Sequence, residues 1–186
     1  MPSIITAGDA SNGLVVASGN DGAVVIQSGL AGAKVNALSI STTGNITLPA
    51  SAAPAFSAYA SGPTSLSNAT WTKVLFATEN FDTNSNFASS TFTPTVAGYY
   101  QINSNILFSA TNGYRIAIYK NGNVIVMASA DGTSGVIDAM GNISALVSMN
   151  GSTDYIDIYA YSNGNGTSSV NASSATQVSG FLARSA

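Results

Sequence analysis

The sequence predicts an all-β protein whose larger part is a sandwich of two sheets. From Tyr100 to Phe108 the even positions are mostly large and apolar, and the odd positions, Leu107 excepted, are polar. This period of two is typical of a strand with one buried face. Asn121-Gly122 separates two further alternating segments, and Asn-Gly in that setting is the strongest short-range signal of a β-hairpin. Gly, Ser, Thr, Asn and Ala fill much of the remainder, which favours short strands joined by tight turns.

Composition argues against several classes of function. Charged residues make up 7% of the 186 residues, and five basic against eight acidic residues leave a net charge of -3. The basic residues are dispersed, at Lys34, Lys73, Arg115, Lys120 and Arg184. Nucleic acid is therefore not an expected partner. The chain has no cysteine, and no apolar run reaches the roughly 20 residues of a spanning helix, so neither thiolate metal sites nor membrane insertion is expected.

Residues 1–50 are expected to form a stem of short strands, namely Gly13–Gly19, Gly22–Gly29, Ala37–Ser41 and Asn45–Pro49. Each strand is too short to bury its own apolar face. The apolar residues concerned are Val15, Val24, Ile26, Leu38, Ile40, Ile46 and Leu48. Association of several chains would cover them, so we expect an intertwined β stem.

A change in composition separates this stem from the rest of the chain. Pro49 and Pro54 bracket a short run of small residues. Proline cannot donate to a strand ladder, and small residues bury little area, so residues 51–54 are expected to form an extended linker. The head then occupies residues 55–186.

The head carries further strand signals. Strands are expected at Ala55–Ser61 and Trp71–Phe76, before a turn-rich loop at Glu79–Ser90. A hairpin joins Arg115–Lys120 to Asn123–Met127 through Asn121-Gly122.

A second hairpin is expected around Asn150-Gly151, between Ile143–Met149 and Tyr155–Tyr161. In its second strand the even residues are aliphatic and should face the interior. The odd residues Tyr155, Tyr159 and Tyr161 should then lie on the opposite face.

Two segments resemble known families. Phe92 to Tyr100, FTPTVAGYY, resembles the F-x-P-x-x-A-G-x-Y signature of the C1q/TNF-like jelly-roll superfamily, and Val178–Leu182, VSGFL, resembles its terminal strand. This resemblance covers residue 55 to the C-terminus and implies a homotrimeric jelly-roll β-sandwich. Ala37–Pro49, ALSISTTGNITLP, resembles stem segments of bacteriophage fibre proteins, in which short strands from three chains wrap one axis.

The resemblance implies a virion structural protein, a homotrimeric short fibre or spike with a host-attachment role. The stem would bind other virion proteins, and the head would contact a host-surface glycan or protein. The N-terminal residues lack the pattern of a secretory signal, which favours a virion part assembled in the host cytoplasm. The candidate receptor contacts are loop residues of 110–114 and 162–169, namely Asn112, Tyr114, Asn163 and Asn165.

Two alternatives remain open. One is a capsid decoration (head fibre) protein without receptor recognition, because a stem of about 50 residues reaches at most roughly 170 Å. The other is a secreted C1q-like glycan-binding protein, which would need a signal peptide.

Tyrosines are the candidates for the trimer interface. Tyr155, Tyr159 and Tyr161 combine apolar area with a hydroxyl that can bond at a rim, and a monomer would leave them exposed. Tyr99 and Leu107, on the odd face of the 100–108 strand, would join them.

Catalysis is not expected. The chain has no histidine, the commonest general base, and its carboxylates do not form a convergent set. Asp154 and Asp157 should point to opposite faces of a strand, while Glu79 and Asp82 share one loop. Ca²⁺ is conceivable at Glu79–Asp82 or Asp131–Asp138, but neither has the spacing of a defined calcium loop, so we expect no cofactor and no metal site.

The composition break generates a first prediction. A chain shortened to begin at Ala55 should fold and keep the head, yet fail to attach to particles, because the stem is the only segment that lacks a core of its own. Circular dichroism and a particle pull-down would measure the two properties. Particle binding by the shortened chain would contradict the assignment.

Overall fold

The computed structural model describes residues 24–28, 35–47, 53–110, 113–130, 137–163 and 168–186. The chain divides into two compact units, Met1–Pro49 and Ala50–Ala186. In the first unit β1 (Val24–Ser28), β2 (Val35–Ile40) and β3 (Ile46–Thr47) form an antiparallel sheet in the order β1-β2-β3. The strand expected at Gly13–Gly19 lies outside the described residues.

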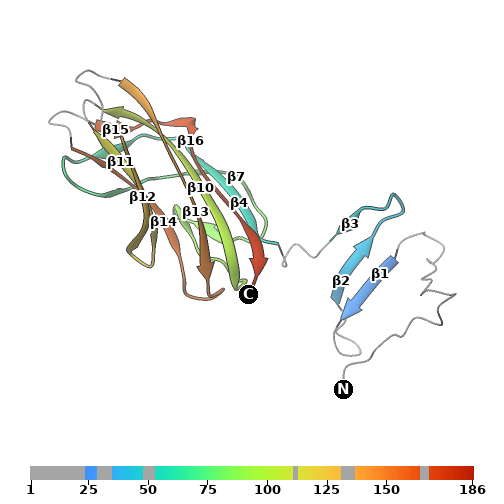
Figure 1. The fold of residues 1–186 in the computed structure, drawn as a ribbon. Helices are drawn as coiled ribbons and strands as arrows, with labels where there is room; N and C mark the ends of the chain where they lie inside the picture. The colour runs from blue at the N-terminus through green and yellow to red at the C-terminus, as the bar shows by residue number, and fades with distance from the viewer. Residues whose placement is uncertain (1–23, 29–34, 48–52, 111–112, 131–136, 164–167) are drawn as a thin grey trace. The chain divides into compact units, whose positions relative to one another are not determined.

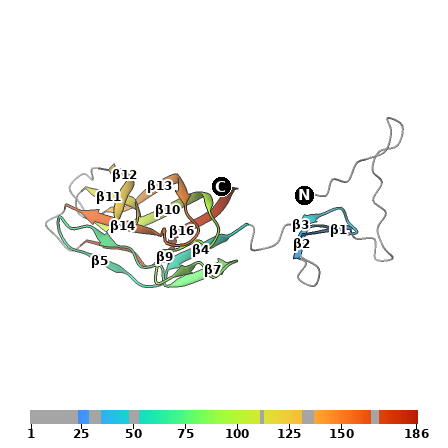
Figure 2. The same cartoon turned by 90° about the horizontal axis from the view of Figure 1, so that it is seen from below.

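The second unit is a sandwich of two antiparallel sheets (Figures 1 and 2). The seven-stranded sheet has the order β5 (Thr64–Leu66), β15 (Ser168–Val170), β10 (Gly98–Ala110), β16 (Ser173–Ser185), β4 (Ala55–Ala60) and β7 (Thr78–Asp82), and β13 (Ile137–Met149) also pairs with β10. The six-stranded sheet has the order β12 (Asn123–Ala130), β11 (Tyr114–Lys120), β14 (Ile156–Ser162), β9 (Thr91–Phe92) and β8 (Phe87–Ala88), and β6 (Thr72–Lys73) also pairs with β14.

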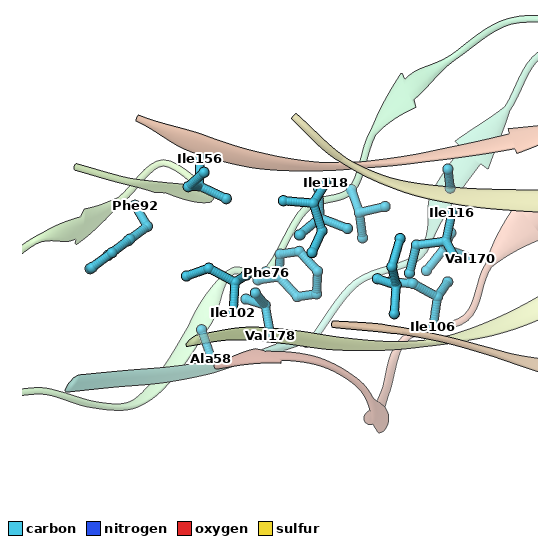
Figure 3. Packing of buried hydrophobic residues seen from close by; sticks show 14 of the residues in the cluster. Ala58, Phe76, Phe92, Ile102, Ile106, Ile116, Ile118, Ile156, Val170 and Val178 are labelled. Atoms are coloured by element: carbon cyan, nitrogen blue, oxygen red, sulfur yellow. The ribbon is translucent and has the colours of Figure 1, made fainter. Parts of the chain in front are cut away.

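Strand β10 is the central strand of the larger sheet. It pairs with β13 from Gly98 to Ala110 and, on its other edge, with β16 from Gly98 to Asn105. Its even residues are buried and its odd residues face outward, so the period of two in the sequence is confirmed. The fully buried residues Ile102 and Ile106 meet Ile116 and Ile118 of β11 in the core between the sheets (Figure 3).

Aromatic rings fill both ends of the core. At one end the ring centroid of Phe92 lies 4.4 Å from that of Phe56 and 5.3 Å from that of Tyr100. Tyr100 is fully buried, and its hydroxyl donates to the carbonyl of Val96 at 2.8 Å. Burial raises the pKa of Tyr100 above its ordinary value. The conformation of the 92–100 segment is thus fixed by its own aromatic side chains.

Gly98, in that segment, is required for space. A Cβ built there would lie 2.5 Å from the carbonyl oxygen of Arg184 in β16. Contact of this kind is repulsive, and β10 pairs with β16 at this point. Only a residue without a side chain lets the two strands approach so closely.

Two expected segments differ from the structure. The loop expected at Glu79–Ser90 contains strands β7 and β8, and the strand expected at Trp71–Phe76 is reduced to β6. Val74 and Phe76 are buried as an alternating strand requires. Hydrogen bonding to β14 nevertheless ends at Val74, whose N–H donates to the Ile158 carbonyl at 2.9 Å. Beyond it side chains bind the backbone: the Leu75 N–H donates to the Thr64 hydroxyl at 3.2 Å, and the Phe76 N–H donates to the Ser90 hydroxyl at 2.9 Å.

The hairpin at Asn121-Gly122 is confirmed, whereas the second hairpin is wrong. Asn121 and Gly122 both have positive φ, as a two-residue turn of this kind needs. By contrast β13 and β14 lie in different sheets, and β14 pairs with β11 instead. Residues 150–155 therefore cross from one sheet to the other.

Gly151 is expected to be the least replaceable residue of this crossing. It has φ +70, and a Cβ built on it would lie 2.3 Å from the Ala97 nitrogen. Gly151→Ala should destabilise the head by about 2–4 kcal/mol, from backbone strain and overpacking. Gly62→Ala, where a Cβ meets nothing within 4 Å, is the matched control and should change stability by less than about 0.5 kcal/mol. Urea unfolding measures both, and equal stability of the two variants would contradict this account.

Candidate interaction surfaces

One outward surface, here called the uncharged face, belongs to the seven-stranded sheet. Strand register places Leu146 and Phe181 on either side of Gln101, and Ser144 and Ser179 on either side of Asn103. Arg184, opposite Tyr99 in the register, is a charged residue at the border of this surface. The face itself is defined by the uncharged residues Tyr59, Phe81, Tyr99, Gln101, Asn103, Asn105, Leu107, Met140, Asn142, Ser144, Leu146, Gln177, Ser179 and Phe181. None of these side chains is ionisable near neutral pH.

Large apolar side chains on this face are left in solvent. Leu146 is 61% exposed, Phe81 51% and Phe181 49%. Tyr99 and Leu146 also line a shallow hollow with the C-terminal residues 183–186. A contiguous uncharged surface of this kind is typical of a protein contact.

A second apolar surface lies at the edge of the other sheet. Strand β12 ends the described six-stranded sheet and contacts β13 of the opposite sheet. Val124, Ile125 and Met127 of β12 are each between 44% and 51% exposed. The edge strand therefore offers both unpaired backbone groups and apolar side chains.

The outward surface of the six-stranded sheet is different. Trp71, just before β6, lies with its ring centroid 5.3 Å from Tyr161 and 6.0 Å from Tyr119, and Tyr119 lies 4.2 Å from Tyr159. We call these four residues the aromatic cluster. Ala117, between Arg115 and Tyr119 on β11, is fully buried because the rings cover its small side chain.

Charged groups adjoin the aromatic cluster. The Arg115 guanidinium lies 5.1 Å from the centre of the Tyr161 ring, a cation–π contact. Lys73 pairs with Asp157 at 2.7 Å. Burial, and then the charge of Asp157, raise the pKa of Tyr159.

The five residues expected at the trimer interface do not share one surface. Tyr159 and Tyr161 belong to the aromatic cluster, and the Tyr155 N–H donates to the Asn121 side chain at 2.9 Å, beside the hairpin turn. Tyr99 and Leu107 lie on the uncharged face, on the other side of the sandwich. A single chain does not leave the three tyrosines fully exposed, as expected for a monomer: all three are half-buried.

The expected receptor contacts divide in the same way. Tyr114 is a core residue: it is 9% exposed, stacks on Phe108 at 4.4 Å, and donates its hydroxyl proton to the Met140 carbonyl at 3.2 Å. It was assigned to a loop, but β11 begins at Tyr114 and turns this side chain inward. Asn163 is exposed. Asn112 and Asn165 lie outside the described residues.

Asp82 and Asp157, two of the carboxylates considered for chemistry, bind neighbouring groups of the fold. Asp82 accepts the N–H of Phe87 at 2.7 Å and that of Asn84 at 3.2 Å. Asp157 accepts the Thr91 hydroxyl at 2.8 Å in addition to Lys73. Among the described residues no group of three or more His, Cys, Asp or Glu could hold a metal, and no helix is long and apolar enough to cross a membrane. The side chains of 131–138 lie outside the description.

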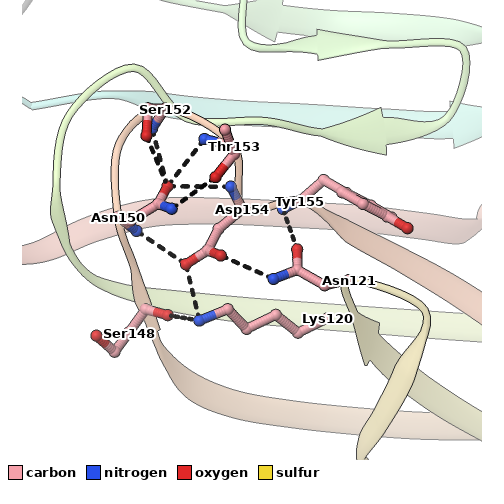
Figure 4. A network of polar contacts seen from close by, with 8 residues as sticks. All are labelled: Lys120, Asn121, Ser148, Asn150, Ser152, Thr153, Asp154 and Tyr155. Atoms are coloured by element: carbon pink, nitrogen blue, oxygen red, sulfur yellow. Dashed lines mark hydrogen bonds and ion pairs between the residues drawn. The ribbon is translucent and has the colours of Figure 1, made fainter.

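Asp154 joins the hairpin turn to the segment that crosses between the sheets (Figure 4). Its carboxylate accepts from Lys120 Nζ at 2.8 Å, Asn121 Nδ2 at 2.7 Å and the Asn150 N–H at 2.9 Å. Asn150 Oδ1 in turn accepts the N–H groups of residues 152–154 at 2.9 to 3.0 Å. The hydrogen bonds from Lys120 and then Asn121 lower the pKa of Asp154.

Comparison with solved structures identifies the fold. The globular domain of zebrafish complement 1qA aligns with a TM-score of 0.52 at 17% identity, over 72% of this chain and 98% of that one. Eiger TNF from S. frugiperda gives 0.52 at 12% identity, over 72% and 93%. Murine APRIL at pH 5.0 gives 0.52 at 14% identity, over 70% and 98%.

The head is a C1q/TNF-like jelly roll. The predicted all-β C1q/TNF-like β-sandwich is therefore confirmed. No family model and no curated protein matches the chain.

The sequence alone does not predict the aromatic cluster, although it contains the alternating side chains that form most of it. Arg115 and Tyr119 alternate on one strand, and Tyr159 and Tyr161 on another. Their contact depends on the pairing of β11 with β14, and the wrong second hairpin had assigned β14 another neighbour. Trp71 reaches the cluster through β6, a further non-local pairing.

Asp154 generates a prediction about pH. Because its pKa is lowered in the folded state, its stabilising effect is complete above the unfolded pKa of about 3.9 and is lost as pH falls through the folded pKa. Asp154→Asn should lower the melting temperature at about pH 7 and much less at about pH 2. Glu79→Gln, at an exposed carboxylate, is the control and should differ little from wild type at either pH. A deficit of Asp154→Asn that persists at about pH 2 would contradict the role of its charge.

Proposed function

We propose that the protein is a structural subunit of a bacteriophage virion, a homotrimeric short fibre or spike. Its N-terminal unit attaches to other virion proteins, and its head contacts the host surface. The C1q/TNF-like head and the fibre-like wording of Ala37–Pro49 support this proposal. It places the mature protein in the virion, after assembly in the host cytoplasm.

The observation that carries the trimer is the uncharged face. Its exposed leucine and phenylalanines lie among uncharged amides and hydroxyls. The hydrophobic effect favours their burial in a contact, and the one charge beside them, Arg184, can keep its guanidinium in water at the rim. Soluble proteins that remain monomeric rarely expose large apolar patches. A second copy of the chain fits this face because its edge strand β12, Asn123–Ala130, is apolar and carries no charged residue.

In the proposed trimer the edge of β12 on one subunit contacts the uncharged face of the next. A cyclic trimer closes through two different surfaces on each subunit. We assign the uncharged face, with Tyr99 and Leu107, to one half, and Val124, Ile125 and Met127 to the other. Tyr155, Tyr159 and Tyr161 then lie away from the trimer contact and stay accessible.

The N-terminal unit favours assembly for the same reason. Ile26 is 55% exposed and Ile46 69% exposed in a sheet of three short strands. Three such strand sets around one axis would bury these residues against each other. The stem would thereby hold the trimer together and leave its outer surface for the particle.

Substitution on the uncharged face tests the trimer. Leu146→Asp should yield monomers in light scattering, because a charge buried at a closed contact costs about 2–5 kcal/mol. Ser61→Asp, at an exposed turn, and Tyr159→Asp, in the aromatic cluster, should remain trimeric. Circular dichroism checks that each variant is folded. A monomeric wild type, or a trimeric Leu146→Asp, would contradict the assignment, and a monomeric Tyr159→Asp would favour the tyrosine surface instead.

The virion role is tested on particles. Particles that lack the protein should adsorb to host cells at least about tenfold more slowly, and labelled protein should restore adsorption. Normal adsorption without the protein would favour the capsid decoration role.

A further inference from the structure

The aromatic cluster has a geometry that suits a ring-shaped ligand. Strand pairing sets Arg115 opposite Tyr161 on the neighbouring strand, and Trp71 continues the row on the far side of Tyr161. Adjacent strands are about 4.8 Å apart, so Arg115 and Trp71 start about 10 Å from each other across the sheet. Trp71 is half-buried, and its ring packs against those of Tyr119 and Tyr161. The platform is therefore already assembled before any ligand binds.

Arg115 is the charged group of this platform for which the described part of the chain offers no acidic partner. Lys73 is bound to Asp157 and Lys120 to Asp154, whereas Arg115 forms no ion pair within the described residues. Its side chain is exposed, and its guanidinium rests on the Tyr161 ring. Stacking of this kind orients the N–H donors toward an incoming anion, and a guanidinium binds a carboxylate through two parallel hydrogen bonds.

We propose that the aromatic cluster and Arg115 bind an oligosaccharide that carries carboxylates. The apolar face of a sugar ring stacks on Trp71, and the carboxylate of a neighbouring sugar accepts hydrogen bonds from Arg115. Sugar rings suit aromatic faces because both surfaces are flat and weakly hydrated, while the tyrosine hydroxyls bond the sugar hydroxyls at the rim. The inference deepens the host-contact part of the proposed function and rests on it for its biological meaning.

Trp71 is the only tryptophan of the chain, so its fluorescence reports on this site in the unaltered protein. Full-length protein is titrated with hexamers of galacturonic acid and of α2,8-linked sialic acid, and with neutral maltohexaose. At least one acidic hexamer should change the emission saturably, with an affinity about tenfold above that of maltohexaose. Recovery of the hexamer intact is expected, since Asp157, the carboxylate described beside the platform, is bound to Lys73 and Thr91. A flat titration with both acidic hexamers, or equal affinity for maltohexaose, would overturn the proposal.

Variants separate stacking from charge. By calorimetry, Arg115→Gln should weaken binding of the acidic hexamer about tenfold, and Arg115→Lys should weaken it less. Trp71→Ala should abolish measurable binding, and Trp71→Phe should retain part of it. Arg184→Gln removes the same charge on the other side of the sandwich and should bind as wild type. Wild-type affinity of Arg115→Gln, or equal binding of polyglutamate, would overturn the proposal.

Failure of the sugar-binding proposal is distinguishable from failure of the proposed function. Light scattering on the same samples reports the trimer, which involves the opposite side of the head. A trimer that attaches to particles but binds neither acidic hexamer would overturn only the sugar site.

Discussion

The head depends on the burial of one face of β10 while both edges of that strand are paired. A strand whose two edges carry ladders cannot shift its register without breaking both, and its period of two then fixes which side chains enter the core. The fixed register turns four large side chains of β10 inward, namely Tyr100, Ile102, Ile106 and Phe108. The same constraint turns the odd residues outward and so creates the uncharged face. Core and interaction surface are thus two sides of one pattern.

How much of the fold the sequence predicts depends on how far apart along the chain the interacting residues lie. The β10 pattern and the Asn121-Gly122 turn are local signals, and both agree with the structure. The link between β13 and β14 also resembled a local turn. It is in fact a crossing between sheets, stabilised locally by Asn150 and, through Asp154 and Tyr155, by bonds to Asn121, which precedes them by 33 and 34 positions. The aromatic cluster could not be predicted without that pairing.

The two outward surfaces of the head are chemically unlike. The seven-stranded sheet presents amides, hydroxyls and large apolar groups, whereas the six-stranded sheet carries Lys73, Asp157 and Arg115 around packed rings. A charge is well solvated where water remains and costly where water is expelled. The distribution therefore favours a dry contact between subunits on the first surface and a wet contact with ligand on the second.

The exposed edge of β12 has a consequence for the life of the unassembled subunit. Val124 to Met127 is an uninterrupted apolar stretch of high strand propensity, without charge or proline, at the border of a sheet. Such a border also accepts strands from misfolded chains. Formation of the proposed trimer would cover this edge. The subunit should therefore aggregate least when it assembles soon after it folds. Synthesis of many copies together would meet that condition, whereas slow and dilute production would leave the edge open to aggregation.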